Sequence, residues 1–254
     1  MADVYGDTFA ALSSQCISPM LDAAGVGPGV TVLDLACGPG VVAAGAHARG
    51  AAVTAVDIAP NMIAQGQKTN PGPDYRQGDA ENLPFDDSSF DAVVCNFGVL
   101  HFPDPDRALA ETYRVLRSGG KLAFTDWCPP KESPYFSILV GAIQTHGTMD
   151  VPLPPGPPMY RFSDAQESLR TVQGIGFSET ATTKIPVISN WTAGEAIWGA
   201  FSEGAVRLGG VLRAQTAENM RKIEQAVLER ARHYQSDGHY RLPMPALMTS
   251  ARKP

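Results

Sequence analysis

The segment VLDLACGPG, residues 32–40, constrains the fold more than any other part of the chain. An apolar run leads directly into a turn with two glycines, and residues that suit a helix follow it. A glycine turn between a strand and a helix presents backbone N–H groups and lets a ligand approach the main chain closely. The segment therefore predicts a strand, a ligand-binding loop and a helix in direct succession.

Four more runs along the chain have the character of short strands, and helical segments separate them. The five predicted strands end at Ala36, Asp57, Ala80, Phe97 and Trp127. Strands that alternate with helices over such a short stretch indicate βα units, short connections and a parallel sheet. We therefore expect an α/β fold of the doubly wound kind.

The helix before the fifth strand has the clearest boundaries. Asp104 can cap its first turn and Pro105 suits the first helical position. Gly119 and Gly120 are expected to stop it. Beyond residue 127 we expect a helix over 135–145, and five prolines between residues 151 and 160 then predict an ordered loop or a lid hinge.

The last third of the chain carries two candidate capping boxes. Ser163 with Gln166, and Thr192 with Glu195, each predict the start of a helix. The other elements expected here are a strand over 179–187, a helix over 215–233 and a last strand over 240–250. These elements predict a sheet that closes with an antiparallel pair.

Composition limits the class of protein. The chain has 254 residues, 44% of them apolar and 18% charged, so it can bury a sizeable core, and we expect one domain over residues 1–254. The net charge of −6 argues against binding to nucleic acid or to an anionic membrane surface. Four scattered cysteines predict reduced thiols and a cytoplasmic location. Neither an export signal nor a membrane span is expected.

The glycine loop has two interpretations. Gly38, Gly40 and Ala43 fit a dinucleotide-binding fingerprint, and Asp57 follows near the position of a ribose-binding acid, so a nicotinamide-dependent oxidoreductase stays open. Asp34 favours a different ligand. A carboxylate within this strand would repel a pyrophosphate, whereas it would attract a ligand that carries an ammonium and a sulfonium group.

A resemblance over residues 28–127 supports the second interpretation. The segments DLACGPG, VDIAPNMI, GDAENLPF and SFDAVVCNFGVLHF occur in this order. Together they resemble the motifs of class I S-adenosylmethionine (SAM)-dependent methyltransferases, in particular the small-molecule branch that resembles the ubiquinone and menaquinone biosynthesis enzymes. The resemblance implies a seven-stranded, mostly parallel sheet with a helical insert or lid between strands five and six. It also implies methyl transfer to an O, N or C atom of a small, partly apolar organic acceptor, with S-adenosylhomocysteine (SAH) as product.

The same resemblance implies a role for each residue of these motifs. Asp34 would contact the methionine amino group of SAM, usually through water, and the loop with Ala36, Gly38 and Gly40 would pass under the ligand. The other implied contacts are Asp57 with the ribose hydroxyls, Ile58 and Met62 on the adenine ring, Asp79 and the Ala80 backbone with the adenine edge, and Asn96 and Phe97 beside the methionine part. A plain core position is the alternative for Met62.

Methyl transfer from a sulfonium is an in-line displacement, so the enzyme mainly has to align the reacting atoms in a dry pocket. A phenol or a carbon nucleophile also needs a general base. His101, directly after the fourth predicted strand, is the first candidate for this base, with a packing role as the alternative. His146 is the second candidate, or else a surface residue.

The acceptor pocket is expected to be closed by the N-terminal segment and by the insert after the fifth strand. Tyr5, Phe9, Trp127 and Tyr160 are the candidate lining residues, each with ordinary packing as its alternative. Arg161 would either bind a substrate carboxylate or pack its stem on the surface.

No metal site is expected, because Asp104, Asp106 and Asp126 do not form a convincing magnesium set. We expect an N-terminal helical cap over 1–27, a cofactor-binding core over 28–128, a substrate-covering insert over 129–174, and C-terminal strands and helices over 175–254. The expected partner is a small-molecule acceptor, without nucleic acid or stable membrane association, and a homodimer stays open. A non-catalytic SAM-binding module is the main alternative function.

Overall fold

The computed structural model describes residues 11–153, 158, 160–204 and 206–254. The chain divides into two compact units, and each is assembled from segments that lie far apart in sequence. The sheet unit contains the described residues of 13–127, 156–185 and 246–254. The helical unit contains those of 1–12, 128–155 and 186–245. The predicted insert, 129–174, is therefore shared between the two units.

The sheet unit is built on a seven-stranded sheet with the order β3-β2-β1-β4-β5-β10-β6. Its strands are β1 (Thr31–Leu35), β2 (Ala52–Asp57), β3 (Asp74–Gln77), β4 (Phe90–Asn96), β5 (Leu116–Trp127), β6 (Ser178–Ile185) and β10 (Ala246–Arg252). Strands β1 to β5 are parallel, and β10 runs antiparallel to both β5 and β6. The predicted doubly wound, mostly parallel sheet and its closing antiparallel pair are confirmed.

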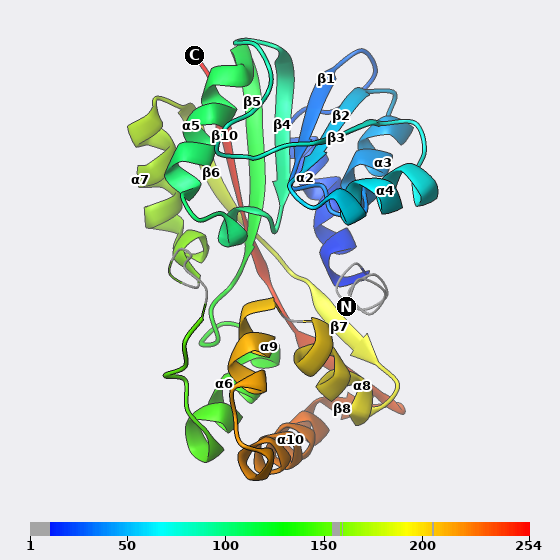
Figure 1. Ribbon diagram of the computed structural model, residues 1–254, viewed down its shortest axis with the longest axis vertical. Coiled ribbons are helices and arrows are strands. Elements are labelled where there is room, and N and C mark those ends of the chain that lie inside the picture. The colour runs from blue at the N-terminus through cyan, green and yellow to red at the C-terminus, as the bar shows by residue number, and fades with distance from the viewer. Residues whose placement is uncertain (1–10, 154–157, 159, 205) are drawn as a thin grey trace. The chain divides into compact units, whose positions relative to one another are not determined.

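Helices cover both faces of this sheet (Figure 1). One face carries η1 (Ser14–Cys16), α2 (Ile17–Ala23), α3 (Val41–Ala48) and α4 (Pro60–Thr69). The other carries α5 (Pro105–Val115) and α7 (Ala165–Ile175). The strand order reverses between β1 and β4, and sheets of this kind bind ligands beyond the carboxyl ends of their strands at such a point.

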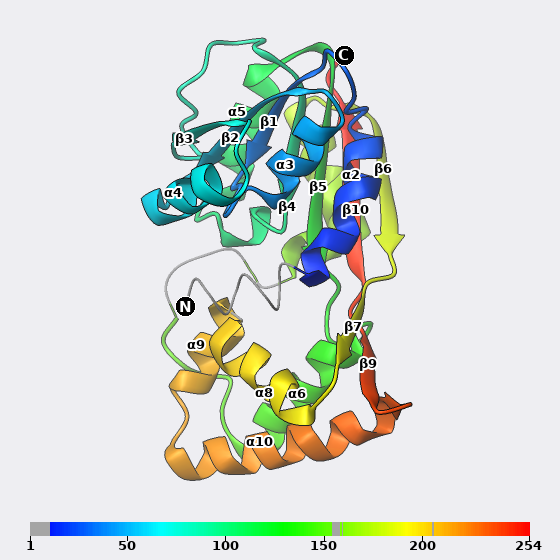
Figure 2. The same ribbon diagram turned by 90° about the vertical axis from the view of Figure 1, so that its right-hand side faces the viewer.

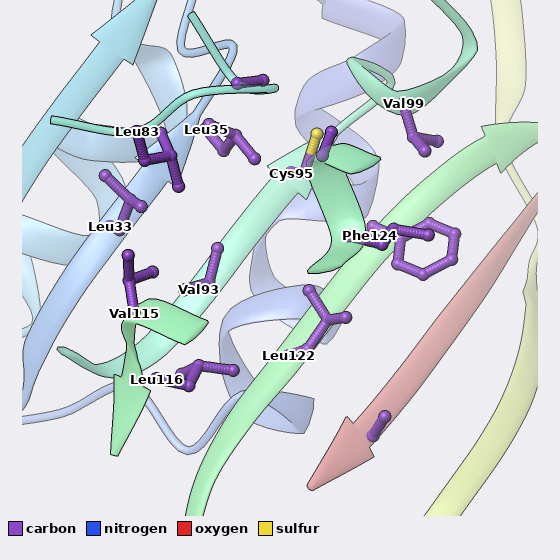
Figure 3. Close-up of a cluster of buried hydrophobic side chains, with 14 of the residues drawn as sticks. Leu33, Leu35, Leu83, Val93, Cys95, Val99, Val115, Leu116, Leu122 and Phe124 are labelled. Atoms are coloured by element: carbon purple, nitrogen blue, oxygen red, sulfur yellow. The ribbon is translucent and has the colours of Figure 1, made fainter. Parts of the chain in front are cut away.

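A hydrophobic core fills the space between the sheet and helices α5 and α7. Figure 3 shows part of this core, with Leu33, Val93 and Leu122 labelled. Leu33, Val93 and Leu122 come from three neighbouring strands, and each is at most 1% exposed. Because side chains alternate along a strand, the residues between them point to the opposite face. Asp34 therefore faces α3, away from this core.

The boundary between α5 and β5 differs from the prediction. Asp104 caps α5 as predicted, accepting a hydrogen bond from the Arg107 N–H at 3.0 Å. The helix ends at Val115, however, and Gly119 and Gly120 lie inside β5. The predicted glycine stop is wrong because the pairing of β5 with β4 begins at residue 116, and the register shifts where these glycines lie.

Both predicted capping boxes are also wrong. The Asp164 carboxylate caps α7 by accepting the N–H groups of Gln166 and Glu167, while the Ser163 hydroxyl donates to the preceding turn. Helix α8 (Gly194–Gly199) follows Ala193, which provides no side-chain cap. In each case the predicted residue lies one position before the cap.

The helical unit combines helices with a small antiparallel sheet of order β7-β9-β8 (Figure 2). Its elements besides α8 are α6 (Pro134–His146), β7 (Ile188–Trp191), η4 (Ala200–Gly204), α9 (Val206–Arg213), α10 (Ala217–Ala231), η5 (Arg232–Tyr234), β8 (Gln235–Ser236) and β9 (His239–Pro243). Tyr135, Phe136 and Phe201 are buried together in its interior.

The single last strand predicted over 240–250 is wrong. Strand β9 ends at Pro243 and belongs to the small sheet, whereas β10 begins at Ala246 and belongs to the large one. Pro243 and Pro245 lack the N–H group that a continuous ladder needs, so the pairing changes partners between them. Across the described ranges, none of the helices has the length and apolar character needed to span a lipid bilayer.

Candidate active site

The loop between β1 and α3 has a tightly curled backbone. Ala36, Gly38 and Gly40 all have left-handed conformations, with φ values of 56°, 53° and 81°. Such a conformation is costly for alanine and is found mostly where function requires it. The Cys37 N–H donates to the Val56 carbonyl at 2.9 Å and so ties the loop to β2.

The two glycines of this loop have different surroundings. A Cβ on Gly40 would overlap the Tyr75 hydroxyl group, so only glycine fits there. The Asn70 amide fixes the loop from the same side by donating to the Pro39 carbonyl at 2.9 Å. A Cβ on Gly38 would meet nothing within 4 Å, which leaves open space over this residue.

Asp34 is a buried acid within β1. Its carboxyl group is 1% exposed, and among the described residues its Oδ2 has no hydrogen-bond partner. Burial raises the pKa of Asp34 to about 8, the N–H of Ala43 in the first turn of α3 lowers it, and the charge of Asp57 raises it. A buried polar atom without a partner is costly, so this oxygen is suited to a cationic ligand.

Asp57 stands at the carboxyl end of β2, and two backbone groups orient its carboxylate. Oδ2 accepts the Gly38 N–H at 2.8 Å, and Oδ1 accepts the Ala59 N–H at 2.9 Å. Each carboxylate oxygen can accept a second hydrogen bond, so both retain capacity for a further donor. A vicinal diol offers two such donors.

The residues predicted for the adenine pocket follow β2 and β3, which are neighbours in the sheet. Ile58 is 67% exposed, although it is a large apolar side chain, and Met62 is half-buried in α4. Asp79 is exposed and Ala80 is buried in the turn after β3. The Gly78 N–H donates to the Asp57 carbonyl at 3.0 Å, so this turn is joined to the end of β2.

Asn96 and Phe97 lie where β4 ends. The Asn96 amide donates to the Ser13 carbonyl at 3.1 Å and accepts the Thr125 hydroxyl at 2.7 Å. Phe97 has a left-handed φ of 57° and stacks on Trp127, with ring centroids 3.7 Å apart and planes 12° from parallel. A buried aromatic pair therefore lies beside the ends of β4 and β5.

The candidate bases lie in different units. His101 is exposed in η2 (Val99–His101), directly after β4, and its N–H donates to the Gly98 carbonyl. His146 is in the last turn of α6, in the helical unit. Tyr5 and Phe9 lie outside the described residues. The cofactor candidates, Trp127 and Tyr160 all belong to the sheet unit.

A second buried acid lies at the end of β5. Asp126 is 2% exposed, its Oδ1 accepts the Trp127 N–H at 2.7 Å, and its Oδ2 has no hydrogen-bond partner within the described part of the chain. Burial raises the pKa of Asp126 to about 7, while backbone hydrogen bonds from Trp127 and Phe162 lower it. The charge of Asp126 adds to burial in raising the pKa of Tyr160, so the two side chains interact.

Arg161 does not have the character of a substrate-binding group. Its guanidinium makes a bidentate pair with Asp106, at 2.6 and 2.9 Å, and a third contact with Glu167 at 3.1 Å. It also lies over the Phe162 ring, 4.8 Å from the centroid. The interpretation of Arg161 as a carboxylate-binding residue is therefore wrong, because two internal carboxylates already hold it.

No group of three acidic, histidine or cysteine side chains that could hold a metal ion occurs among the residues that the structure describes. Asp104 caps α5 and Asp106 pairs with Arg161.

Comparison with known proteins finds matches within the sheet unit. Residues 33–124 match a family described as a methyltransferase domain. A demethylmenaquinone methyltransferase from Renibacterium salmoninarum is 39% identical over 119 residues, which is 47% of this chain and 50% of that protein. A second one, from Beutenbergia cavernae, is 38% identical over 49% of this chain and 52% of its own length. Residues 33–124 of the chain are thus similar to methyltransferase domains.

Solved structures agree on the fold. The YcgJ protein from Bacillus subtilis has a TM-score of 0.61 at 18% identity and covers 95% of this chain and 99% of its own. Geranyl diphosphate methyltransferase in complex with SAM has a TM-score of 0.55 at 19% identity, over 95% of this chain and 85% of its own. The chain spans about half the length of the curated methyltransferases that it matches.

Residues that support the site from below were not found by sequence reasoning. Tyr75 lies against Gly40 and Gly66, and its hydroxyl donates to the Asn70 carbonyl at 2.9 Å. Thr125 joins the ends of β4 and β5 by binding Asn96 and the Phe97 N–H. These contacts connect residues distant in sequence, and no local pattern marks them.

Proposed function

We propose that this chain is a SAM-dependent methyltransferase that acts on a small, partly apolar organic acceptor. The observation that carries the proposal is Asp34, a buried carboxyl group with an unpartnered oxygen, at the end of β1 beside the open space over Gly38. A dinucleotide would bring its pyrophosphate next to this acid and be repelled, whereas SAM would bring an ammonium and a sulfonium.

The residues present fit SAM in four respects. The free oxygen of Asp34 would hold the methionine amino group, directly or through water. The oriented carboxylate of Asp57 would take the ribose hydroxyls with its remaining lone pairs. Ile58, exposed beside Asp57, would cover one face of adenine, and Asp79 and Ala80 would meet its edge. Phe97, with Asn96, would border the methionine part.

SAM supplies an electrophilic methyl group on a sulfonium when it is bound. The residues of this chain then have to hold the acceptor atom in line and keep water out. The strained backbone at Ala36 and at Phe97 fixes the ends of β1 and β4, the two strands at the switch point. His101, exposed directly after β4, is the base that we propose for an acceptor that approaches from that side.

The comparisons support a small-molecule acceptor. The curated relatives are named demethylmenaquinone methyltransferases, and one structural neighbour is named geranyl diphosphate methyltransferase. We infer from these names that the acceptor of this chain has an apolar part. The cytoplasmic location, the homodimer, the division into four segments and the pocket-lining roles of Trp127 and Tyr160 stay predictions.

The proposal is tested by calorimetric titration of the purified protein with SAH, with NADH as the control ligand. SAH is expected to bind in the micromolar range and NADH is expected not to bind. Binding of NADH alone would support the nicotinamide-dependent oxidoreductase instead. Binding of SAH without methyl transfer from labelled SAM to a panel of phenols, amines and activated carbons would favour the non-catalytic binding module.

A further inference from the structure

We propose that Asp126 and Tyr160 bind the methyl acceptor, and that Asp126 Oδ2 takes the proton of a phenolic or enolic hydroxyl as that oxygen is methylated. This inference rests on the proposed function, since it assigns the acceptor side of the same site. It makes Asp126 of β5 the base for an acceptor hydroxyl that reaches the end of β5, whereas His101 of η2 is the base proposed for an acceptor that approaches from the side of η2.

The position of Asp126 follows from the register of the sheet. Asp34 of β1 pairs with Val94 of β4, and Val94 pairs with Ala123 of β5. Asp126 therefore lies three residues nearer the carboxyl edge than Asp34, which is about 10 Å along the strand, and two strand spacings, also about 10 Å, to the side. Asp126 has the same alternation as Leu122 and Phe124, so its side chain lies on the face of α5 and α7, whereas Asp34 lies on the face of α3. An acceptor would reach both sides only across the carboxyl edge of the sheet, at the ends of β4 and β5.

Backbone hydrogen bonds from Trp127 and Phe162 hold the Asp126 carboxyl group. Oδ1 is fixed by the Trp127 N–H at 2.7 Å, so the carboxyl group is held in one orientation, and Oδ2 remains without a partner among the described residues. An asparagine or a leucine would avoid the cost of burying an acid here. The stacked pair of Phe97 and Trp127 lies on the neighbouring strand ends, which suits an acceptor with a planar ring.

Tyr160 is held in a strained conformation next to this acid. Its φ is 69°, which is uncommon for a residue with a bulky side chain. The Ser163 hydroxyl donates to the Tyr160 carbonyl at 2.7 Å, and the bidentate pair of Arg161 with Asp106 anchors the next residue to α5. These contacts keep the segment folded over β5, where the Phe162 ring packs edge-on against Phe124 with centroids 5.6 Å apart.

The proton transfer balances in atoms and charge. The hydroxyl oxygen of the acceptor forms a bond to the methyl carbon, the carbon–sulfur bond breaks, and its electron pair remains on sulfur. The hydroxyl proton passes to Asp126 Oδ2, which later releases it to solvent. With a pKa of about 7, raised by burial, the carboxyl group can both accept and release this proton near neutral pH. The Tyr160 hydroxyl would orient the acceptor oxygen.

The test uses 4-nitrophenol as the probe, with the protein saturated by SAH for binding and supplied with SAM for turnover. Turnover is assayed at about pH 6, where the phenol still carries its proton, and the phenol that remains is read by its visible absorption after each sample is made alkaline. D126N is expected to lower kcat about 100-fold, the scale for losing a general base. Y160F is expected to raise KM severalfold and leave kcat nearly unchanged. D74N, an isosteric change of an exposed carboxylate on β3, is expected to match the wild type.

A second readout follows the proton itself. Binding of 4-nitrophenol to the SAH-saturated wild type is expected to change the infrared band of a protonated carboxyl group, and D126N is expected to abolish this change. D126L provides a second variant if D126N does not fold. SAH affinity of each variant is measured in parallel and is expected to stay within twofold of the wild type.

The outcomes separate the two proposals. If the wild type does not bind SAH, the proposed function fails. If it binds SAH but not 4-nitrophenol, or if D126N turns over as fast as the wild type, the proposed function stands and the role of Asp126 is overturned. Equal loss of SAH and phenol binding in D126N would show that Asp126 is structural.

Discussion

The carboxyl ends of β1 and β5 each carry a buried acid with one unpartnered oxygen, yet they are built differently. At β1, glycines curl the backbone around open space, and a second acid, Asp57, lies close by. At β5 there is no glycine loop. Instead, the backbone N–H groups of Trp127 and Phe162 hold the Asp126 carboxyl group, and Tyr160 interacts with it. An acid beside open space and a second acid suits a cation, whereas an acid beside a tyrosine hydroxyl suits a neutral group with a proton to give.

The same comparison shows why burial alone does not assign a role. Burial is the main reason that both pKa values are raised, to about 8 for Asp34 and about 7 for Asp126. What separates the two acids is their neighbours, Asp57 in one case and Tyr160 in the other. The role assigned to each acid therefore depends on which ligand can approach it, and substitutions at the two strand ends should have different consequences.

The largest expected effect is a loss of stability caused by a substitution in the glycine loop after β1. Gly40→Ala should lower the free energy of unfolding by about 2–5 kcal/mol, because the new methyl group would overlap Tyr75 in a left-handed backbone. Gly38→Ala should cost only about 1–2 kcal/mol, since its φ is also positive but nothing touches its Cβ. Denaturant unfolding measures both. Gly38→Ala should also weaken SAH binding, because its methyl group would occupy the space proposed for the ligand. Normal SAH affinity in Gly38→Ala would contradict the proposal that SAH lies over this residue.

Asp57→Ala should weaken SAH binding by about 1–3 kcal/mol, the scale for losing hydrogen bonds to a charged group. It removes the proposed ribose contact and also the two backbone hydrogen bonds that orient the loop. Calorimetry with Asp74→Asn as the matched control measures the difference. Unchanged SAH affinity in Asp57→Ala would contradict the assignment of the ribose hydroxyls to Asp57.

The two acids should give the protein without ligand a stability that falls with rising pH. A carboxyl group whose pKa is raised on folding binds its proton more tightly in the folded state. Its stabilising effect is complete below the unfolded pKa, near 4, and is lost as pH rises to the folded value, about 8 for Asp34 and about 7 for Asp126. The slope is at most about 1.4 kcal/mol per pH unit for each group.

Asp34→Asn should therefore flatten the pH profile of unfolding up to pH 8, and Asp126→Asn should flatten it up to pH 7. The two variants should be alike in this respect and unlike in binding, because only Asp34→Asn is expected to weaken SAH binding. Denaturant unfolding at several pH values gives the profiles. Equal loss of SAH affinity in both variants would remove the distinction between the acids.

The smallest expected effect is at the clamp that holds Tyr160. Arg161→Met keeps the apolar stem and removes the ion pairs with Asp106 and Glu167, which are partly exposed. The loss of stability should be about 1 kcal/mol or less, or a Tm shift of about 2–4 °C. SAH affinity should not change, and turnover of 4-nitrophenol should fall, because Tyr160 loses its anchor. A fall in SAH affinity would show that the clamp supports the cofactor side.

The fold was predictable where the signal is local. The glycine loop, the parallel strands and the Asp104 cap follow from neighbouring residues, because turn geometry and capping depend on a few positions. The site could be predicted only as a set of carboxylates and glycines after strands. Its supports, Tyr75 behind Gly40 and Thr125 between β4 and β5, depend on contacts across the sheet that no single segment encodes.

The arrangement of the helical unit could not be predicted from the sequence. The helix over 217–231 was predictable from its apolar spacing. The helical unit as a whole, however, combines residues from before and after β6, and this assembly depends on packing between distant segments. The last strand was predicted as one piece because the apolar pattern continues through Pro243 and Pro245, whereas the backbone changes sheets there. The sequence around Asp126 does not distinguish it from other acids at strand ends. Only its burial and its unpartnered oxygen in the structure indicate a role in ligand binding.

The most direct test of the central claim is a crystal structure of the protein with SAH. The amino group of SAH should lie within hydrogen-bonding or single-water distance of Asp34 Oδ2, the ribose hydroxyls should contact Asp57, and the backbone should pass under the ligand at Gly38. SAH bound elsewhere, or bound here with its amino group directed away from Asp34, would contradict the assignment of this buried acid to a cationic ligand.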